Sequence, residues 1–82
     1  MDRGGLVIPN DALVNALREL DFEFKRQADR VMIYKRRGST TRVALRRIDY
    51  HDEEAARTVL RQAGMSAQAI EGFISNYKTN HH

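Results

Sequence analysis

The chain has 82 residues, no cysteine and a formal net charge of +3 at pH 7. A chain of this length forms one small domain that buries only about 60–65% of its unfolded surface, which excludes a deep cleft between two lobes. The lack of cysteine excludes disulfides, zinc–thiolate sites and thiol nucleophiles.

The N-terminal part is predicted to be a loose leader, residues 1–9, followed by an amphipathic helix over residues 11–20. Within the leader, Leu6–Ile8 could dock as a short edge segment. Asn10 is a suitable N-cap, and Leu13, Leu17 and Leu20 then recur at helical spacing. The helix is predicted to end at Asp21.

The apolar period then changes to two, which predicts three strands: one that begins at Phe22, one over residues 31–36 and one over residues 41–47. Residues 28–30 and 38–40 supply the turns. Alternation places one set of side chains toward the core, namely Phe22, Phe24, Val31, Ile33, Val43 and Leu45. It places the other set on a face that an antiparallel sheet can leave in water, namely Lys25, Tyr34, Arg36, Arg42 and Arg46.

Helical spacing returns after Tyr50. The acidic run Asp52–Glu54 suits a helix N-terminus, and Gly64 is a typical stop. Ser66 is predicted to cap a last helix whose stripe, with Phe73 and Tyr77, belongs to the core or, if that helix is loosely docked, to a dimer contact. The order α-β-β-β-α-α with a three-stranded antiparallel sheet predicts a two-layer α+β domain over residues 10–78, with a tail over residues 79–82.

Positive charge is concentrated in one stretch. Residues 25–47 contain nine basic residues and one acidic residue, a charge of +8, whereas the rest of the chain carries −5. A compact basic surface on a small domain attracts polyanions, above all nucleic-acid backbones. Two interpretations are open: the surface binds an anionic partner, either RNA or an acidic protein, or it is a solvated strand surface that keeps the domain soluble.

Several short motifs occur in an order that is typical of one protein family. Asp21–Phe24 follows the first helix, Arg26-Gln27 enters the first hairpin, Val31–Tyr34 continues it, and Arg57–Ser66 (RTVLRQAGMS) closes the pattern. Over about residues 10 to 75 the chain thereby resembles the HicA (YcfA-like) family of bacterial toxin–antitoxin systems. The resemblance implies an α-β-β-β-α fold like that of double-stranded-RNA-binding domains, an RNA target and an antitoxin-type protein partner.

The resemblance also implies a catalytic residue. HicA toxins are ribosome-independent mRNA interferases, and their catalytic histidine lies in a Gly-Ser-His stretch that opens the second strand. Counted without gaps from Arg26-Gln27, that stretch corresponds to Asp29-Arg30-Val31, so Val31 takes the place of the histidine. Valine has no proton or lone pair to offer, so acid–base cleavage through this position is unavailable. We therefore expect a HicA-like domain that is not a nuclease.

His51 is the only histidine inside the predicted domain and the only obvious group for proton transfer near pH 7. An active ribonuclease that uses His51 is therefore the alternative. The simpler interpretation is structural: with Asp49 and Asp52, His51 belongs to the cap and first turn of the following helix. No nucleophile or second base is identified, and the spacing of these three residues matches no established metal site. We expect neither catalysis nor metal binding here.

Two features of the strands could contact RNA. The hairpin Arg36–Arg42 combines arginines with Ser39 and Thr40, whose hydroxyls can bind phosphate. Tyr34, predicted on the open face, could stack on a base. By contrast, the acidic run Asp52–Glu54 would repel a phosphate backbone, which argues against the usual mode of duplex-RNA binding.

The sequence therefore predicts a cytoplasmic domain without cofactor or membrane span, which binds RNA or an acidic antitoxin-type protein through a basic sheet face. A pure protein-interaction module is the remaining alternative. The residues predicted to carry binding are Lys25, Arg30, Tyr34, Arg36, Arg37, Arg42, Arg46 and Arg47.

Overall fold

The computed structural model describes residues 6–79, with side chains over residues 6–77. Its elements are β1 (Val7–Pro9), α1 (Asn10–Glu19), β2 (Phe22–Ala28), β3 (Val31–Arg36), β4 (Arg42–Arg46), β5 (Tyr50–Asp52), α2 (Glu53–Gln62) and α3 (Ala67–Thr79). The predicted order of one helix, three strands and two helices is confirmed, and the short strands β1 and β5 are added to it.

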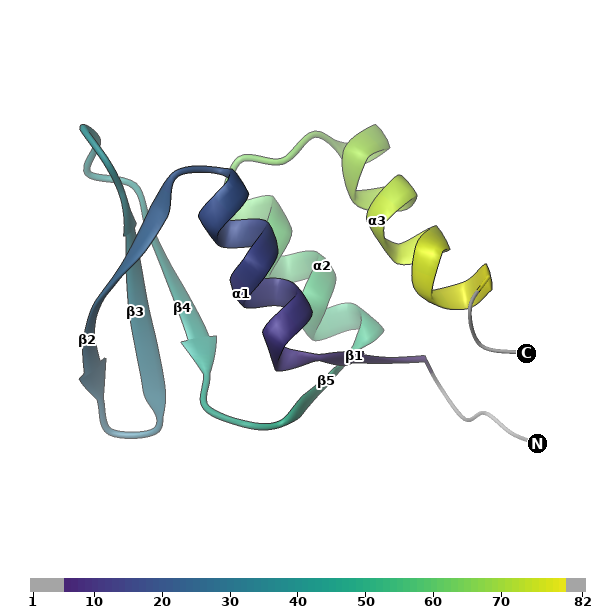
Figure 1. The fold of residues 1–82 in the computed structure, drawn as a ribbon, viewed down its shortest axis with the longest axis horizontal. Helices are drawn as coiled ribbons and strands as arrows, with labels where there is room; N and C mark the ends of the chain where they lie inside the picture. The colour runs from purple at the N-terminus through teal and green to yellow at the C-terminus, as the bar shows by residue number, and fades with distance from the viewer. Residues whose placement is uncertain (1–5, 80–82) are drawn as a thin grey trace.

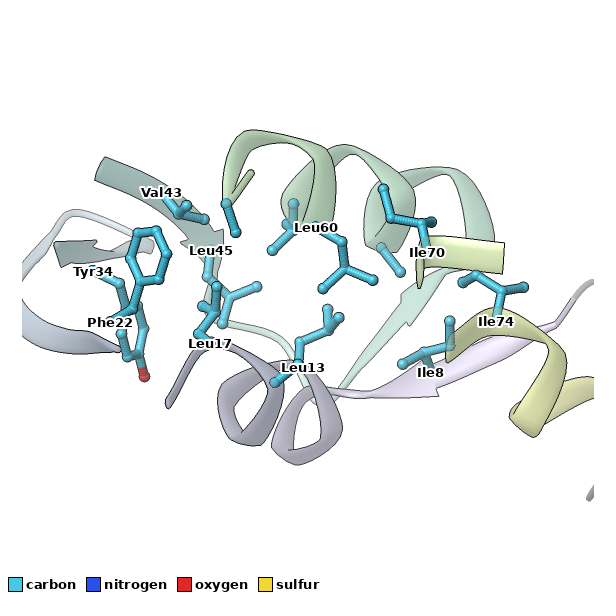
Figure 2. Close-up of a cluster of buried hydrophobic side chains, with 14 residues drawn as sticks. Ile8, Leu13, Leu17, Phe22, Tyr34, Val43, Leu45, Leu60, Ile70 and Ile74 are labelled. Carbon is cyan, nitrogen blue, oxygen red and sulfur yellow. The ribbon is translucent and has the colours of Figure 1, made fainter. Parts of the chain in front are cut away.

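The architecture is α+β, with the helices on one side of an antiparallel sheet. Strands β2, β3 and β4 form that sheet in this order. Helices α1 and α2 lie side by side against one of its faces, and α3 packs on α2 farther from the sheet (Figure 1). Buried side chains run without a break from Tyr34 in the sheet, through Leu60 in α2, to Ile8 and Ile74 (Figure 2). No helix in the described part of the chain is long and apolar enough to cross a membrane.

Strands β1 and β5 form a separate two-stranded antiparallel ribbon, in which Ile8 lies opposite His51. The docking of the segment Leu6–Ile8 is thus confirmed. Ile8 is fully buried, so the folded unit includes the end of the segment predicted as a leader. The rest of that leader, residues 1–5, and the tail residues 80–82 lie outside the described residues.

Local capping sets the ends of α2 and the start of α3, as predicted. Asp52 Oδ1 accepts a 2.7 Å hydrogen bond from the Ala55 amide at the start of α2. At its end, Gly64 has a φ of +89°, and the amides of Gly64 and Met65 donate to earlier carbonyls of the helix, which is the glycine-based termination expected there. Ser66 Oγ accepts from the Ala69 amide.

The start of α1 differs from the prediction. The residue before the helix is Pro9, no side chain caps the helix, and Asn10 is already its first residue. The predicted N-cap role of Asn10 is therefore wrong. Its side-chain amide oxygen lies instead 2.9 Å from Nε2 of His51, which the β1–β5 ribbon brings next to it.

The predicted orientation of the middle strand is also wrong. Residues directly opposite each other in an antiparallel pair point to the same side of the sheet. Tyr34 lies opposite both Phe24 and Val43, so it points into the core and is only 4% exposed. The neighbouring side chains of Val31 and Ile33 point away from the helices. The sequence misleads here because Val31–Tyr34 is apolar throughout, so its alternation has no phase of its own.

Candidate binding face of the sheet

The register defines the sheet face that the helices leave uncovered, which we call the outer face. Three rows of directly opposed residues cross the three strands on this side. The rows are Glu23–Lys35–Arg42, Arg26–Ile33–Ala44 and Ala28–Val31–Arg46. Apolar side chains thus occupy the centre, and charged side chains stand around them.

Four basic side chains of the outer face surround this centre, namely Arg26, Lys35, Arg42 and Arg46. Within residues 6–77 none of the four has an ion-pair partner. Lys35 lies between Glu23 and Arg42 in its row, so one directly opposed neighbour attracts its charge and the other repels it.

The arginine of α2 provides a contrast with these four. Arg57 donates to Glu53 at 3.0 Å and forms a bidentate pair with Glu71 of α3, and these hydrogen bonds raise the pKa of its guanidinium group. Its charge is therefore neutralised within the domain. The four basic side chains of the outer face have no such ion pairs within residues 6–77.

The remaining predicted basic residues flank the outer face. Lys25 lies at the register shift between Phe24 and Arg26, which marks a β-bulge. Arg30 and Arg47 lie together at the turn end of the sheet, where the Arg47 amide donates to the Arg30 carbonyl. Arg37 is exposed, and its Nε lies 3.9 Å from a carboxylate oxygen of Glu23.

Two predicted binding residues point to the other side of the sheet, so their expected placement on the open face is wrong. The Tyr34 ring packs edge-on against Phe24, with ring centroids 5.8 Å apart, and burial raises the pKa of its phenol. Arg36 Nε donates to the Leu20 carbonyl at 3.2 Å, and its guanidinium group lies 5.7 Å from the centre of the Phe22 ring. Arg36 therefore connects the sheet to the end of α1.

The hairpin between β3 and β4 uses its hydroxyl groups internally. Ser39 Oγ lies 2.9 Å from Thr41 Oγ1 and accepts from the Thr41 amide at 3.1 Å. Gly38 permits the turn with a φ of +69°. The predicted phosphate-binding role of the Ser39 hydroxyl thus competes with the bonds that shape the turn, whereas Thr40 is exposed.

His51 is buried, with 2% of its surface exposed. Burial and the charge of Arg46 lower its pKa, although Asp52 acts in the opposite direction. The ring lines a cavity of about 220 Å³ between β4 and α2, whose lining includes Arg46, Thr58 and Gln62 but no carboxylate, lysine or second histidine. This lining supplies no acid–base partner for His51. The described residues bring together no group of three side chains that could hold a metal ion.

The outer face includes two basic residues that the sequence prediction did not select, Arg26 and Lys35. Their positions depend on the pairing of β3 with its neighbours and on the bulge at Lys25, which are not local properties of the sequence. One signal was available: if the aromatic rings of Phe24 and Tyr34 are placed together on the core side, Lys35 follows on the outer face.

No family model, curated protein or solved structure matches this chain.

Proposed function

We propose that this chain is a HicA-like binding domain, related in fold to double-stranded-RNA-binding domains, that does not cleave RNA and binds an acidic antitoxin-type protein through its outer face. One observation carries the proposal. Four basic side chains without ion-pair partners in the described part of the chain surround an apolar centre on a sheet face that no helix covers.

The arrangement of the elements supports the HicA-like lineage. Helix α1, the three-stranded sheet and α2 follow one another in the order that the resemblance implies, and both helices cover the same sheet face. Val31, at the position of the family histidine, belongs to the outer face and lies opposite Arg46. A ligand on this face would therefore contact that position, where an isopropyl group can transfer no proton.

The composition of the outer face favours a protein over RNA. Val31, Ile33 and Ala44 form an apolar centre, and a polar rim around such a centre is the usual anatomy of a protein interface. Single strands of RNA are held largely by stacking on aromatic side chains, and Tyr34 points to the opposite side. RNA remains the second candidate, since the same four cations can contact phosphates.

The test compares two variants with equal loss of charge. One carries Lys35→Gln and Arg42→Gln on the outer face; the control carries Arg18→Gln and Arg61→Gln on exposed positions of α1 and α2. Binding is measured to an acidic protein that co-purifies with the chain, to a single-stranded RNA and to an RNA duplex. We expect the outer-face variant to bind the protein about tenfold or more weakly, which corresponds to about 1.4 kcal/mol per factor of ten, and the control to change little.

The RNA measurements decide between the two ligands. Loss of two phosphate contacts would reduce the slope of log K against log salt by about 1.4 for a single strand. Tight RNA binding with that reduction, and no binding of the protein, would assign the outer face to RNA. If both variants behave like the unmodified chain toward every ligand, the outer face is not a binding surface.

A further inference from the structure

The cavity between β4 and α2 contains polar groups that neither the fold nor the proposed function uses. Strand β4 is an edge of the sheet, so one side of its main chain has no neighbouring strand. The Arg36 amide donates to the Thr41 carbonyl and the Arg47 amide to the Arg30 carbonyl, and these hydrogen bonds fix which residues of β4 bond to β3. Because bonded and non-bonded residues alternate, the main-chain groups of Ala44 point away from β3. Ala44 lines the cavity, so its main chain offers one donor, the amide, and one acceptor, the carbonyl, on this side of β4.

His51 has a ring nitrogen without a partner in the same cavity. Its Nε2 lies 2.9 Å from Asn10 Oδ1, an atom that only accepts, so Nε2 carries the hydrogen and Nδ1 is unprotonated. No hydrogen bond to Nδ1 exists within the described residues, and no fully buried side-chain nitrogen or oxygen there lacks a partner. Nδ1 is therefore not fully enclosed, and His51 is one of the residues that line the cavity.

Few charged residues lie near His51. Arg46 of β4 lines the cavity, and Asp52 follows in β5. Asn10 of α1 and Ile8 of β1 are uncharged, as are all the α2 residues of the cavity wall. Arg46 has no ion-pair partner among residues 6–77. The cavity is thus a positively charged recess with no carboxylate in its lining.

We propose that this cavity binds one oxyanion group, a phosphate or a carboxylate, through the guanidinium group of Arg46, the amide of Ala44 and the imidazole of His51. A neutral Nδ1 would repel an anion, so binding includes uptake of one proton at His51, after which Nδ1–H donates to the oxyanion. The bound charge offsets the burial and the repulsion from Arg46 that lower the pKa of His51. The site goes beyond the proposed function, although Arg46 belongs to both surfaces.

The probes are inorganic phosphate and acetate, added to the full chain at constant ionic strength while the histidine ring signals are followed by NMR. We expect saturable shifts of the His51 signals and a rise in its titration midpoint. A rise of about one pH unit corresponds to about tenfold tighter binding to the protonated ring. Response to phosphate alone assigns the site to phosphate groups, and response to both probes assigns it to oxyanions in general.

Variants separate this site from the outer face. Arg46→Gln, at an exposed position, should weaken phosphate binding at least tenfold, whereas the matched control Arg42→Gln on the same strand should leave it within about twofold. The Lys35→Gln and Arg42→Gln variant should lose the macromolecular partner but keep the phosphate response. The proposal is overturned if phosphate moves the His51 signals no more than chloride does, or if Arg42→Gln weakens binding as much as Arg46→Gln.

Discussion

Arg36 should be essential for stability, although the sequence suggests a binding residue. Its Nε donates to the carbonyl of Leu20, the residue that follows the last turn of α1, where main-chain acceptors lack helical partners. A hydrogen bond from a charged donor contributes about 1.5–3 kcal/mol, and the contact with the Phe22 ring adds about 0.5–1 kcal/mol. Since the two contributions share one side chain, we expect Arg36→Leu to lower the free energy of unfolding by about 2–3 kcal/mol.

Urea and thermal unfolding measure this loss. With an m-value of about 1 kcal/mol/M for a chain of this size, the urea midpoint should fall by about 2–3 M. The melting temperature should fall by about 10–20 °C. Arg36→Lys, which keeps the charge but has no planar fork of donors, should lie between Arg36→Leu and the unmodified chain.

Arg42→Leu serves as the control because Arg42 is exposed and has no hydrogen bond or ion pair in the described part of the chain. Its unfolding free energy should change by less than about 0.5 kcal/mol. The reasoning is refuted if Arg36→Leu is as stable as Arg42→Leu. It is equally refuted if Arg36→Leu loses ligand binding while its stability is intact.

Three further predictions concern the ends of α2 and its surroundings. Because burial and the charge of Arg46 lower the pKa of His51 in the folded chain below its ordinary value, the unfolded chain takes up a proton first as the pH falls. The unfolding free energy should therefore decrease below about pH 6.5, and this decrease should be smaller in the His51→Gln variant. The prediction is wrong if a folded His51→Gln variant shows the same dependence of unfolding free energy on pH as the unmodified chain. Gly64→Ala should destabilise by about 1 kcal/mol because of the positive φ, whereas Gly72→Ala, within α3 and with open space around its Cα, should stabilise by about 0.5–1 kcal/mol. Thermal melts of the pair test the claim, which fails if both shift in the same direction. Asp52→Ala should cost about 1 kcal/mol through loss of the helix cap, and should lower the His51 midpoint further, as NMR titration would show.

The parts of the fold that depend on local chemistry could be predicted from the sequence. Asp52, Gly64 and Ser66 mark helix ends through bonds to residues a few positions away, and all three act as predicted. The side chain of Asn10 could also cap a helix, but it contacts the ring of His51 instead. Its contact with His51 spans 41 residues, so no local pattern contains it.

The candidate site could be predicted only in part. Its residue types can be read from one segment of the sequence, but the side of the sheet on which each residue lies depends on the pairing of strands. The basic segment is evident in the sequence, and Arg42 and Arg46 point outward as expected. Tyr34 and Arg36 lie on the opposite side from the one expected, since the side on which each β3 residue lies is set by the pairing with the strands beside it. The sequence pattern assigns the apolar side chains of Val31 and Ile33 to the core, and only the register places them at the centre of the outer face.

The ribbon of β1 and β5 closes the chain into a ring, since everything from α1 to β4 lies between its two strands. Closing a loop of 41 residues costs about 3.3 kcal/mol of chain entropy. The three paired residues on each side of the ribbon contribute little stabilisation against this cost until the helices have formed. The ribbon should therefore form late in folding and open early in the native state. The Asn10 amide donates to the Asp49 carbonyl across this closure. Backbone amides of this kind should exchange with deuterium earlier than the amides of the three-stranded sheet.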